Sequence, residues 1–157
     1  GNVPTRIEKL EQGMVDATFL AMAGLNRLGL SEHVTSILDP DQFLPACGQG
    51  VIGIELRVGD DANAALFDAI VCPKTSLVMT AERAALQVLD GSCHTPVGAF
   101  ATLMDGVMHL RVAVAQPDGS EFFEDSISGP VASIEDARTM GQVIGHRLKP
   151  RLPEGIL

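Results

Sequence analysis

The stretch around Cys93 has the residue types best suited to covalent chemistry. Cys93 lies in Leu-Asp-Gly-Ser-Cys-His-Thr-Pro-Val-Gly at positions 89–98, on a predicted loop between a helix and a strand. Flanking glycines leave room for its side chain, and a thiol presented on a loop can serve as a nucleophile or as an attachment point. His94 adds little, because neighbouring side chains usually diverge. Spacing alone favours an ordinary packing cysteine, so local context has to decide.

The cysteines as a set give no sign of a disulfide framework or a metal site. There are three of them, an odd number, and no C-x-x-C pair would bring two thiolates to one zinc ion. Reduced thiols are typical of the cytosol, so we expect a cytoplasmic protein without a bound metal. We interpret Cys47 and Cys72 as packing residues.

Composition excludes several classes of protein. With 157 residues, 46% hydrophobic and 20% charged, the chain is typical of a globular protein. Its net charge of −9 argues against a nucleic-acid partner, and no apolar run reaches the roughly 18–20 residues that span a membrane. The opening Gly-Asn-Val-Pro has no initiator methionine, so we expect a piece of a longer chain.

The first part of the chain has an α/β pattern. Apolar runs at Ala17–Ala21 and Val51–Val58 predict two strands that are buried on both faces. Helical patterns are found around them, at residues 2–12, 24–30 and about 61–70. Because two strands do not make a stable sheet, we expect this part of the fold to be incomplete.

The second part has an α+β pattern. The predicted elements are a helix over 73–89, strands over 97–104, 107–116 and 121–128, and a helix that starts after Ser133 and stops before Pro150. Asp105-Gly106 is a strong hairpin signal, and Ser133 with Asp136 resembles a capping box. The residues expected to face the core are Leu77, Ala81, Ala84, Val88, Met108, Leu110, Val112, Val114, Ile134, Ala137, Ile144 and Leu148.

Five sequence motifs together resemble one family. They are GNVPTRIEKL at 1–10, AMAGLNRLGL at 21–30, LPACGQGVIGIE at 44–55, TAERAALQVLDGSCHTPVGA at 80–99 and PDGS at 117–120. In this order and spacing they resemble hydroxymethylbilane synthase, also called porphobilinogen deaminase, a transferase family of tetrapyrrole (haem) biosynthesis. The resemblance covers essentially the whole chain, and the combination of GQG-x-x-G-I-E with TAER and L-x-G-x-C-x-x-P-x-G is highly specific.

The resemblance implies a three-domain parent protein. Two α/β domains like those of periplasmic binding proteins face each other across a cleft, and a small α+β domain follows. This chain would be the C-terminal half: residues 1–44 the end of domain two, 45–72 a hinge and a returning segment of domain one, and 73–157 the complete third domain. The fold class expected is therefore α/β followed by α+β.

The resemblance also implies a covalent cofactor. The family builds dipyrromethane from two porphobilinogen units and holds it through a thioether to the cysteine that matches Cys93. Four more porphobilinogen units are added with loss of ammonia, and hydrolysis releases the linear tetrapyrrole. A cysteine suits this role because a thiolate is a strong carbon nucleophile.

Other positions match cofactor-binding residues of the family. Arg6 and Arg27 would bind the cofactor's carboxylates, since the arginine fork pairs with carboxylates and stays charged. Without the resemblance, Arg6 would be read as a solvated helix arginine and Arg27 as a helix C-cap. Ala21 would line the cleft, and Gln49 with Gly50 would lie in the hinge near the cofactor.

The family's catalytic aspartate has no match in 1–157, and by the resemblance it lies upstream of Gly1. We therefore expect no catalytic residue within this chain and no turnover by the chain alone. The expected partners are porphobilinogen and the N-terminal part of the same enzyme, and the full-length parent is expected to be a monomer. Glu82 and Arg83 are interpreted as a helix-surface or interdomain pair.

Two alternatives belong to other functional classes. The first is an inert pseudo-enzyme or an interaction module that uses the C-terminal domain. The second is an unrelated hydrolase with Cys93 as nucleophile and His94 as base, but that hypothesis leaves the motif match unexplained.

Overall fold

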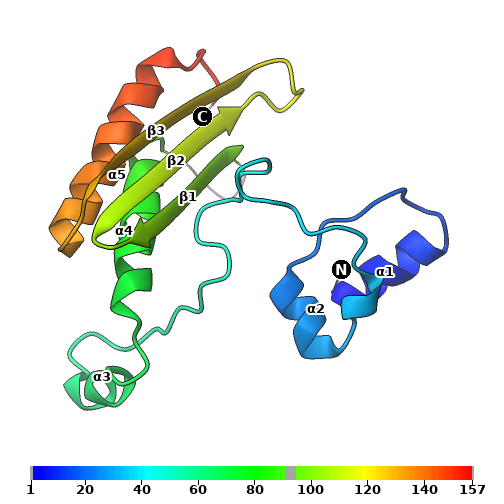
Figure 1. Cartoon of the computed structure of the whole chain (residues 1–157), viewed down its shortest axis with the longest axis horizontal. Helices are drawn as coiled ribbons and strands as arrows, with labels where there is room; N and C mark the ends of the chain where they lie inside the picture. The colour runs from blue at the N-terminus through cyan, green and yellow to red at the C-terminus, as the bar shows by residue number, and fades with distance from the viewer. Residues whose placement is uncertain (1, 91–94, 157) are drawn as a thin grey trace. The chain divides into compact units, whose positions relative to one another are not determined.

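The structure is a computed structural model that describes residues 2–90 and 95–156. The chain divides into two compact units, Gly1–Asp39 and Pro40–Leu157. Figure 1 shows the first unit in blue, and the second from cyan to red.

The first unit is helical among its described residues. Helix α1 (Val3–Glu11) starts at Asn2, whose side chain accepts a hydrogen bond from the Thr5 amide. Helix α2 (Met22–Leu28) ends at Gly29, which has the left-handed φ of 68° that favours glycine, and a 3-10 turn covers Ser31–His33. The two helices are those predicted at residues 2–12 and 24–30.

Both strands predicted in the α/β part are wrong. Neither Ala17–Ala21 nor Val51–Val58 forms a strand. A strand exists only when its backbone pairs with another strand, and within the described ranges neither segment has one. The apolar side chains are consequently exposed rather than buried, as at Ile52 (88%) and Val58 (fully).

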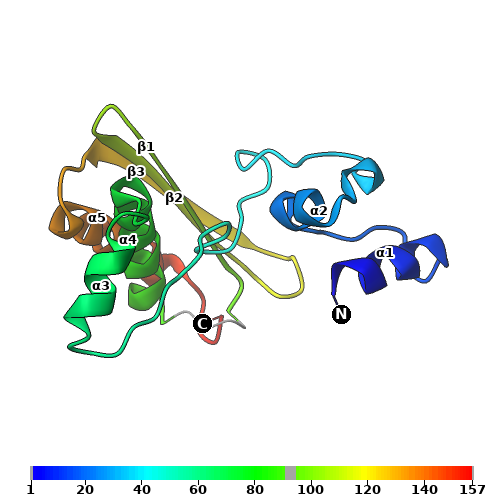
Figure 2. The same cartoon turned by 90° about the horizontal axis from the view of Figure 1, so that it is seen from below.

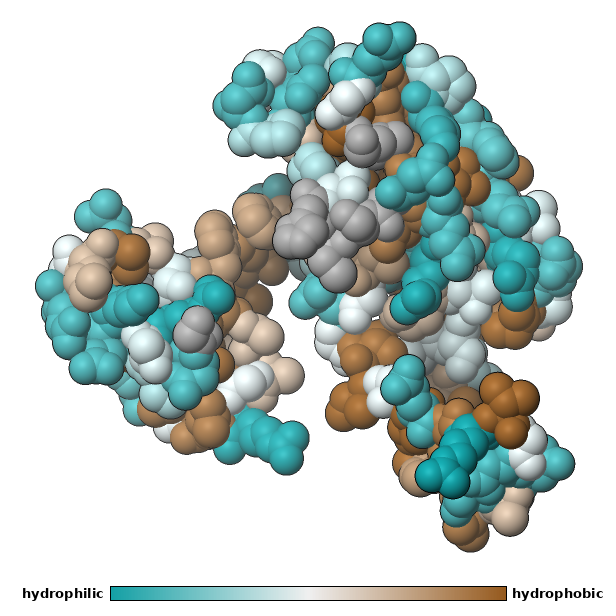
Figure 3. Space-filling view, turned by 180° about the vertical axis from the view of Figure 1, so that it is seen from behind, coloured by the Kyte–Doolittle hydropathy of each residue, from teal (hydrophilic) through white to brown (hydrophobic). Residues whose placement is uncertain are grey.

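Helix α3 (Asp61–Phe67) follows the second of these segments, and the Asp60 carboxylate accepts from the Asn63 amide at its start. The helix ends earlier than the predicted residue 70. Leu66 and Ile70 are largely exposed, and Figure 3 shows hydrophobic surface in the lobe around this helix. This region has apolar side chains with little to pack against in the described chain.

The second unit contains the predicted three-stranded antiparallel meander. Strands β1 (Val97–Met104), β2 (Val107–Ala115) and β3 (Phe122–Pro130) lie in the order β1-β2-β3. Asp105 and Gly106 join the first two with φ of 49° and 77°, as the tight hairpin requires. Met104 pairs with Val107 and Val97 with Val114, which places alternate residues of each strand toward the helices.

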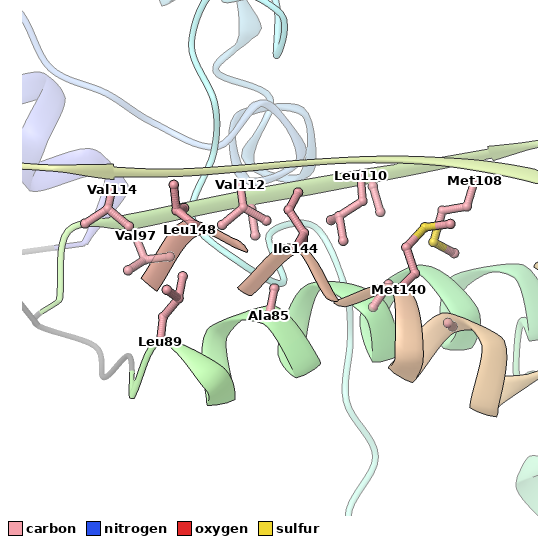
Figure 4. Packing of buried hydrophobic residues seen from close by; sticks show 14 of the residues in the cluster. Ala85, Leu89, Val97, Met108, Leu110, Val112, Val114, Met140, Ile144 and Leu148 are labelled. Carbon is pink, nitrogen blue, oxygen red and sulfur yellow. The ribbon is translucent and has the colours of Figure 1, made fainter. Parts of the chain in front are cut away.

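Two helices cover one face of this sheet (Figure 2): α4 (Pro73–Val88) and α5 (Ile134–Leu148). Helix α5 begins with the predicted capping box of Ser133 and Asp136. Ile134, predicted to face the core, is 43% exposed because contact with the core begins one turn later. Figure 4 shows the side chains that fill the space between the layers, among them Ala85, Leu89, Val97, Met108, Leu110, Val112, Val114, Met140, Ile144 and Leu148.

Helices α4 and α5 approach each other at two glycines. A Cβ atom on Gly141 would lie 2.1 Å from the carbonyl oxygen of Ala81 and 2.8 Å from the Ala84 Cβ. A Cβ on Gly145 would lie 2.8 Å from the Cβ of Val88. The backbone of α5 therefore packs directly against α4, with no space for a side chain between them.

The opposite face of the sheet holds the start of the second unit. From β2, the Arg111 guanidinium donates to Glu124 Oε1 at 2.6 Å and to the carbonyl oxygens of Pro40 and Asp41 at 3.3 and 3.2 Å. The hydrogen bond to Glu124 is the main cause that raises the pKa of Arg111. Residues 40–41 are therefore attached to the sheet.

Candidate functional site

Cys93 and His94 lie outside the described residues, but the chain that leads to them is well anchored. Helix α4 ends at Val88, and Lys149 Nζ donates to the Val88 carbonyl oxygen at 2.8 Å and forms an ion pair with Asp90. Asp90 has a left-handed φ of 52°. Lys149 thus caps the helix and holds its last turn. A positive charge at this position stabilises a helix C-terminus.

The chain after this stretch is attached to the sheet. The Ala115 amide of β2 donates to the Pro96 carbonyl oxygen at 3.1 Å, and β1 begins at Val97. Contacts with helices and strands of the second unit therefore hold the chain both before and after residues 91–94.

The segment before Gly48 runs beside the free edge of β1. Ala46 forms an antiparallel bridge with Gly98, and the Ala99 amide donates to the Pro45 carbonyl oxygen at 3.0 Å. A Cβ on Gly98 would lie 3.1 Å from the Leu44 side chain and 3.2 Å from the Pro45 oxygen, so the close approach depends on glycine. The predicted hinge thus begins with a single antiparallel bridge to the edge of β1.

Glu82 is buried, so the helix-surface alternative for Glu82 and Arg83 is wrong, whereas the interdomain alternative stays a prediction. Glu82 is 4% exposed, and its carboxylate accepts from the amides of Gly48 and Ala101, each at 2.9 Å, whereas Arg83 is exposed. Burial raises the pKa of Glu82, and the two amide hydrogen bonds act against that rise. Its residue type suggested the surface, but its helical spacing with Ala85 and Leu89 indicated the core.

Gln49 is exposed on a turn between two glycines. Gly48 and Gly50 have φ of 77° and 76°, in the left-handed region that favours glycine. The hydrogen bond to Glu82 holds the backbone at Gly48, directly before Gln49. The Gln49 side chain itself is exposed and can contact a ligand.

Arg6 of α1 lines a pocket of about 210 Å³ in the first unit. The other lining residues are Thr5, Lys9, Val15, Ala17 and Thr18. The Thr5 hydroxyl donates to Asn2 Oδ1 at 2.7 Å, so the groups of this pocket that can bind a carboxylate are the Arg6 and Lys9 cations and the Thr18 hydroxyl. Sequence reasoning did not single out Lys9, although it lies one helical turn from Arg6.

Ala21 and Arg27 belong to the same short helix. Ala21 is the N-cap of α2 and Arg27 lies in its last turn, and both residues are exposed. Neither lines the pocket at Arg6.

The two described cysteines differ in their surroundings. Cys47 is half-buried against the core, as predicted, and burial followed by the nearby Glu82 charge raises the pKa of its thiol to about 11. Cys72 is exposed, so its interpretation as a packing residue is wrong: it is the N-cap of α4, outside the core. Hydrogen bonds from the side chain and backbone of Thr75 are the main causes that lower the pKa of Cys72.

We therefore expect iodoacetamide to alkylate Cys72 well before Cys47 at mildly alkaline pH. The thiolate is the reactive form, and the lowered pKa of Cys72 gives more of it, whereas the thiol of Cys47 stays protonated up to a pKa of about 11. Timed quenching and peptide mass spectrometry measure both rates. Equal rates in the folded protein, or faster labelling of Cys47, would contradict this assignment.

Within residues 2–90 and 95–156 no three His, Cys, Asp or Glu side chains come together as a metal site. No helix in the same ranges is long and apolar enough to cross a membrane.

Comparison with known proteins matches two parts of this chain to models of one protein family. Residues 1–65 match the family model described as porphobilinogen deaminase, dipyromethane cofactor binding domain, and residues 76–150 match the one described as porphobilinogen deaminase, C-terminal domain. The chain belongs to the porphobilinogen deaminase family.

Curated relatives agree with this assignment. The porphobilinogen deaminase of Nitrobacter winogradskyi is 46% identical over 98% of this chain, and that of Paracoccus denitrificans is 45% identical over the same share. In each case the match covers 48% of the relative. The chain therefore spans about half the length of the curated relatives it matches.

Proposed function

We propose that this chain supplies the C-terminal part of a hydroxymethylbilane synthase, the enzyme also called porphobilinogen deaminase. Its substrate is porphobilinogen, and four units are joined with loss of ammonia before hydrolytic release. The observation that carries the proposal is the match of both family models, in order, across 1–65 and 76–150.

In this proposal Cys93 is the attachment point for dipyrromethane. The thiol acts as a nucleophile in its thiolate form, and a thioether holds the attached group through every later addition. When bound, dipyrromethane supplies the primer that is extended. The contacts of Lys149 with residues 88–90 and of β2 with Pro96 support this proposal, because they hold the described chain on either side of residues 91–94.

The cationic pocket of the first unit fits the cofactor's acidic side chains. Arg6 and Lys9 line a hollow that can take a carboxylate, and tethering at Cys93 makes each binding event effectively intramolecular. Arg27 is assigned to another carboxylate, Ala21 to the wall of the cleft, and Gln49 with Gly50 to the cofactor's neighbourhood. Because the overall charge is −9, the proposal places Arg6 and Arg27 facing the cofactor and the acidic residues on the outer surface.

The remainder of the enzyme completes the fold in this proposal. Residues 1–44 end a second α/β domain like that of a periplasmic binding protein, 45–72 return to the first such domain, and 73–157 form the third. The exposed apolar segment Val51–Val58 supports this, because pairing in a sheet would bury it. The remainder would supply the catalytic aspartate, and the complete enzyme is a cytoplasmic monomer.

A chimeric enzyme tests the proposal. The N-terminal half of the Nitrobacter winogradskyi relative is placed ahead of Gly1, and porphobilinogen consumption and tetrapyrrole formation are measured. We expect turnover by the chimera and none by this chain alone, because the chain lacks the aspartate and half of the cleft. A chimera that folds, as judged by circular dichroism, but consumes no porphobilinogen would favour the interaction module instead.

A further inference from the structure

The Glu82 carboxylate joins three segments of the second unit. The residue belongs to α4, its Oε2 accepts from the Gly48 amide, and its Oε1 accepts from the Ala101 amide of β1. One oxygen therefore holds the turn that contains Gln49, and the other holds the sheet. Helix α4 is also the element that leads toward Cys93.

The contact with Ala101 continues the pairing along the edge of β1. The Ala99 amide donates to Pro45, and two residues later the Ala101 amide donates to Glu82. Amides two residues apart point to the same side of a strand. Antiparallel pairing that sets Ala46 opposite Gly98 would place Phe43 opposite Ala101 if it continued, and the Glu82 carboxylate occupies that acceptor position instead.

Gly48 is held from more than one side. Besides its amide hydrogen bond, its position lies against Met79 of α4, where a Cβ atom would come within 3.1 Å of the methionine methyl carbon. The preceding residue, Cys47, packs against the core. The buried Glu82 carboxylate is the polar group among these contacts of Gly48.

We propose that Glu82 is a positioning residue, which holds the Gly48–Gly50 turn on α4 and β1 and so sets where Gln49 stands. The effect of Glu82 on the reaction rests on the proposed function, in which Gln49 lies near the cofactor. The contact itself does not depend on that function.

Glutamine at position 82 separates these roles, because it keeps the size of the side chain but has one acceptor oxygen instead of two. Its NH2 group would face an amide donor, so one of the two hydrogen bonds is lost. In hydrogen-exchange measurements on the whole chain, Glu82→Gln should speed exchange of the Gly48 or Ala101 amide by about tenfold or more. The Val112 amide, within the core strand, should be unchanged.

In the chimeric enzyme, Glu82→Gln should lower kcat by about tenfold, since one lost hydrogen bond shifts the turn that presents Gln49. The matched control is Val112→Ala, which weakens the same core but touches neither the turn nor its hydrogen bonds. It should keep kcat at temperatures where both variants are folded.

The outcomes are distinct. Unchanged exchange at both amides in Glu82→Gln overturns the positioning contact, and so does equal kcat for Glu82→Gln and Val112→Ala. An inactive parent chimera would instead refute the proposed function, and the exchange experiment would still decide the role of Glu82.

Discussion

Replacing Cys93 with serine is expected to abolish both cofactor attachment and turnover in the chimeric enzyme. A serine hydroxyl is a far weaker nucleophile than a thiolate at neutral pH, so no bond to the primer forms. Without the tether, each addition would also lose the advantage of being intramolecular. Intact-mass measurement on protein made in a host with a working haem pathway should show the added mass of two porphobilinogen units less two ammonias in the parent, and none in Cys93→Ser.

The matched control is Cys72→Ser, which removes an exposed thiol whose pKa is lowered and which is therefore a competing nucleophile. This variant should keep both the added mass and the activity. Peptide mapping that finds the adduct on Cys72 or Cys47, or an adduct that survives in Cys93→Ser, would contradict the assignment.

Gly141→Ala should destabilise the C-terminal unit by about 3 kcal/mol, at the upper end of what overpacking usually costs. The added methyl would lie 2.1 Å from the Ala81 carbonyl oxygen, a backbone atom that cannot rotate away, so α4 and α5 must separate. The chain has no Trp or Tyr, so far-ultraviolet circular dichroism during urea unfolding is the suitable measurement.

Gln142→Ala is the control, because the neighbouring side chain on the same helix is exposed and alanine favours helix. It should change the unfolding free energy by less than about 0.5 kcal/mol. A Gly141→Ala variant as stable as Gln142→Ala would show that the two helices do not pack as closely as the structure has them.

The elements from helix α4 onward could be predicted almost one by one because their sequence signals are local. Asp105-Gly106 defines one hairpin, and Ser133 with Asp136 defines the start of a helix, within a few residues of sequence. Alternation in β2 likewise identified the buried positions Met108 to Val114. The predictions failed where the deciding contact is distant in sequence.

The segments Ala17–Ala21 and Val51–Val58 show that failure, since an apolar run indicates burial but cannot supply the strand beside it. Glu82 is a second failed prediction. Its charge suggested a surface position, whereas two backbone amides 19 and 34 residues away in the sequence hold its carboxylate in the core. Of the candidate site, Cys93 was singled out by the motif and stays a prediction. The anchoring by Lys149 could not be predicted, because Lys149 and Asp90 are 59 residues apart in the sequence.

The attachment of residues 40–48 to the sheet also decides where the C-terminal domain can be excised. A polypeptide that begins at Pro73 would leave the Ala99 amide and half of the Glu82 carboxylate without their partners, on a newly open strand edge. One that begins at Pro40 keeps the Arg111 contacts, the bridge between Ala46 and Gly98, and the turn at Gly48. A piece that keeps all these contacts therefore begins at Pro40, 33 residues before helix α4 starts at Pro73, because residues 45–46 contact the free edge of β1.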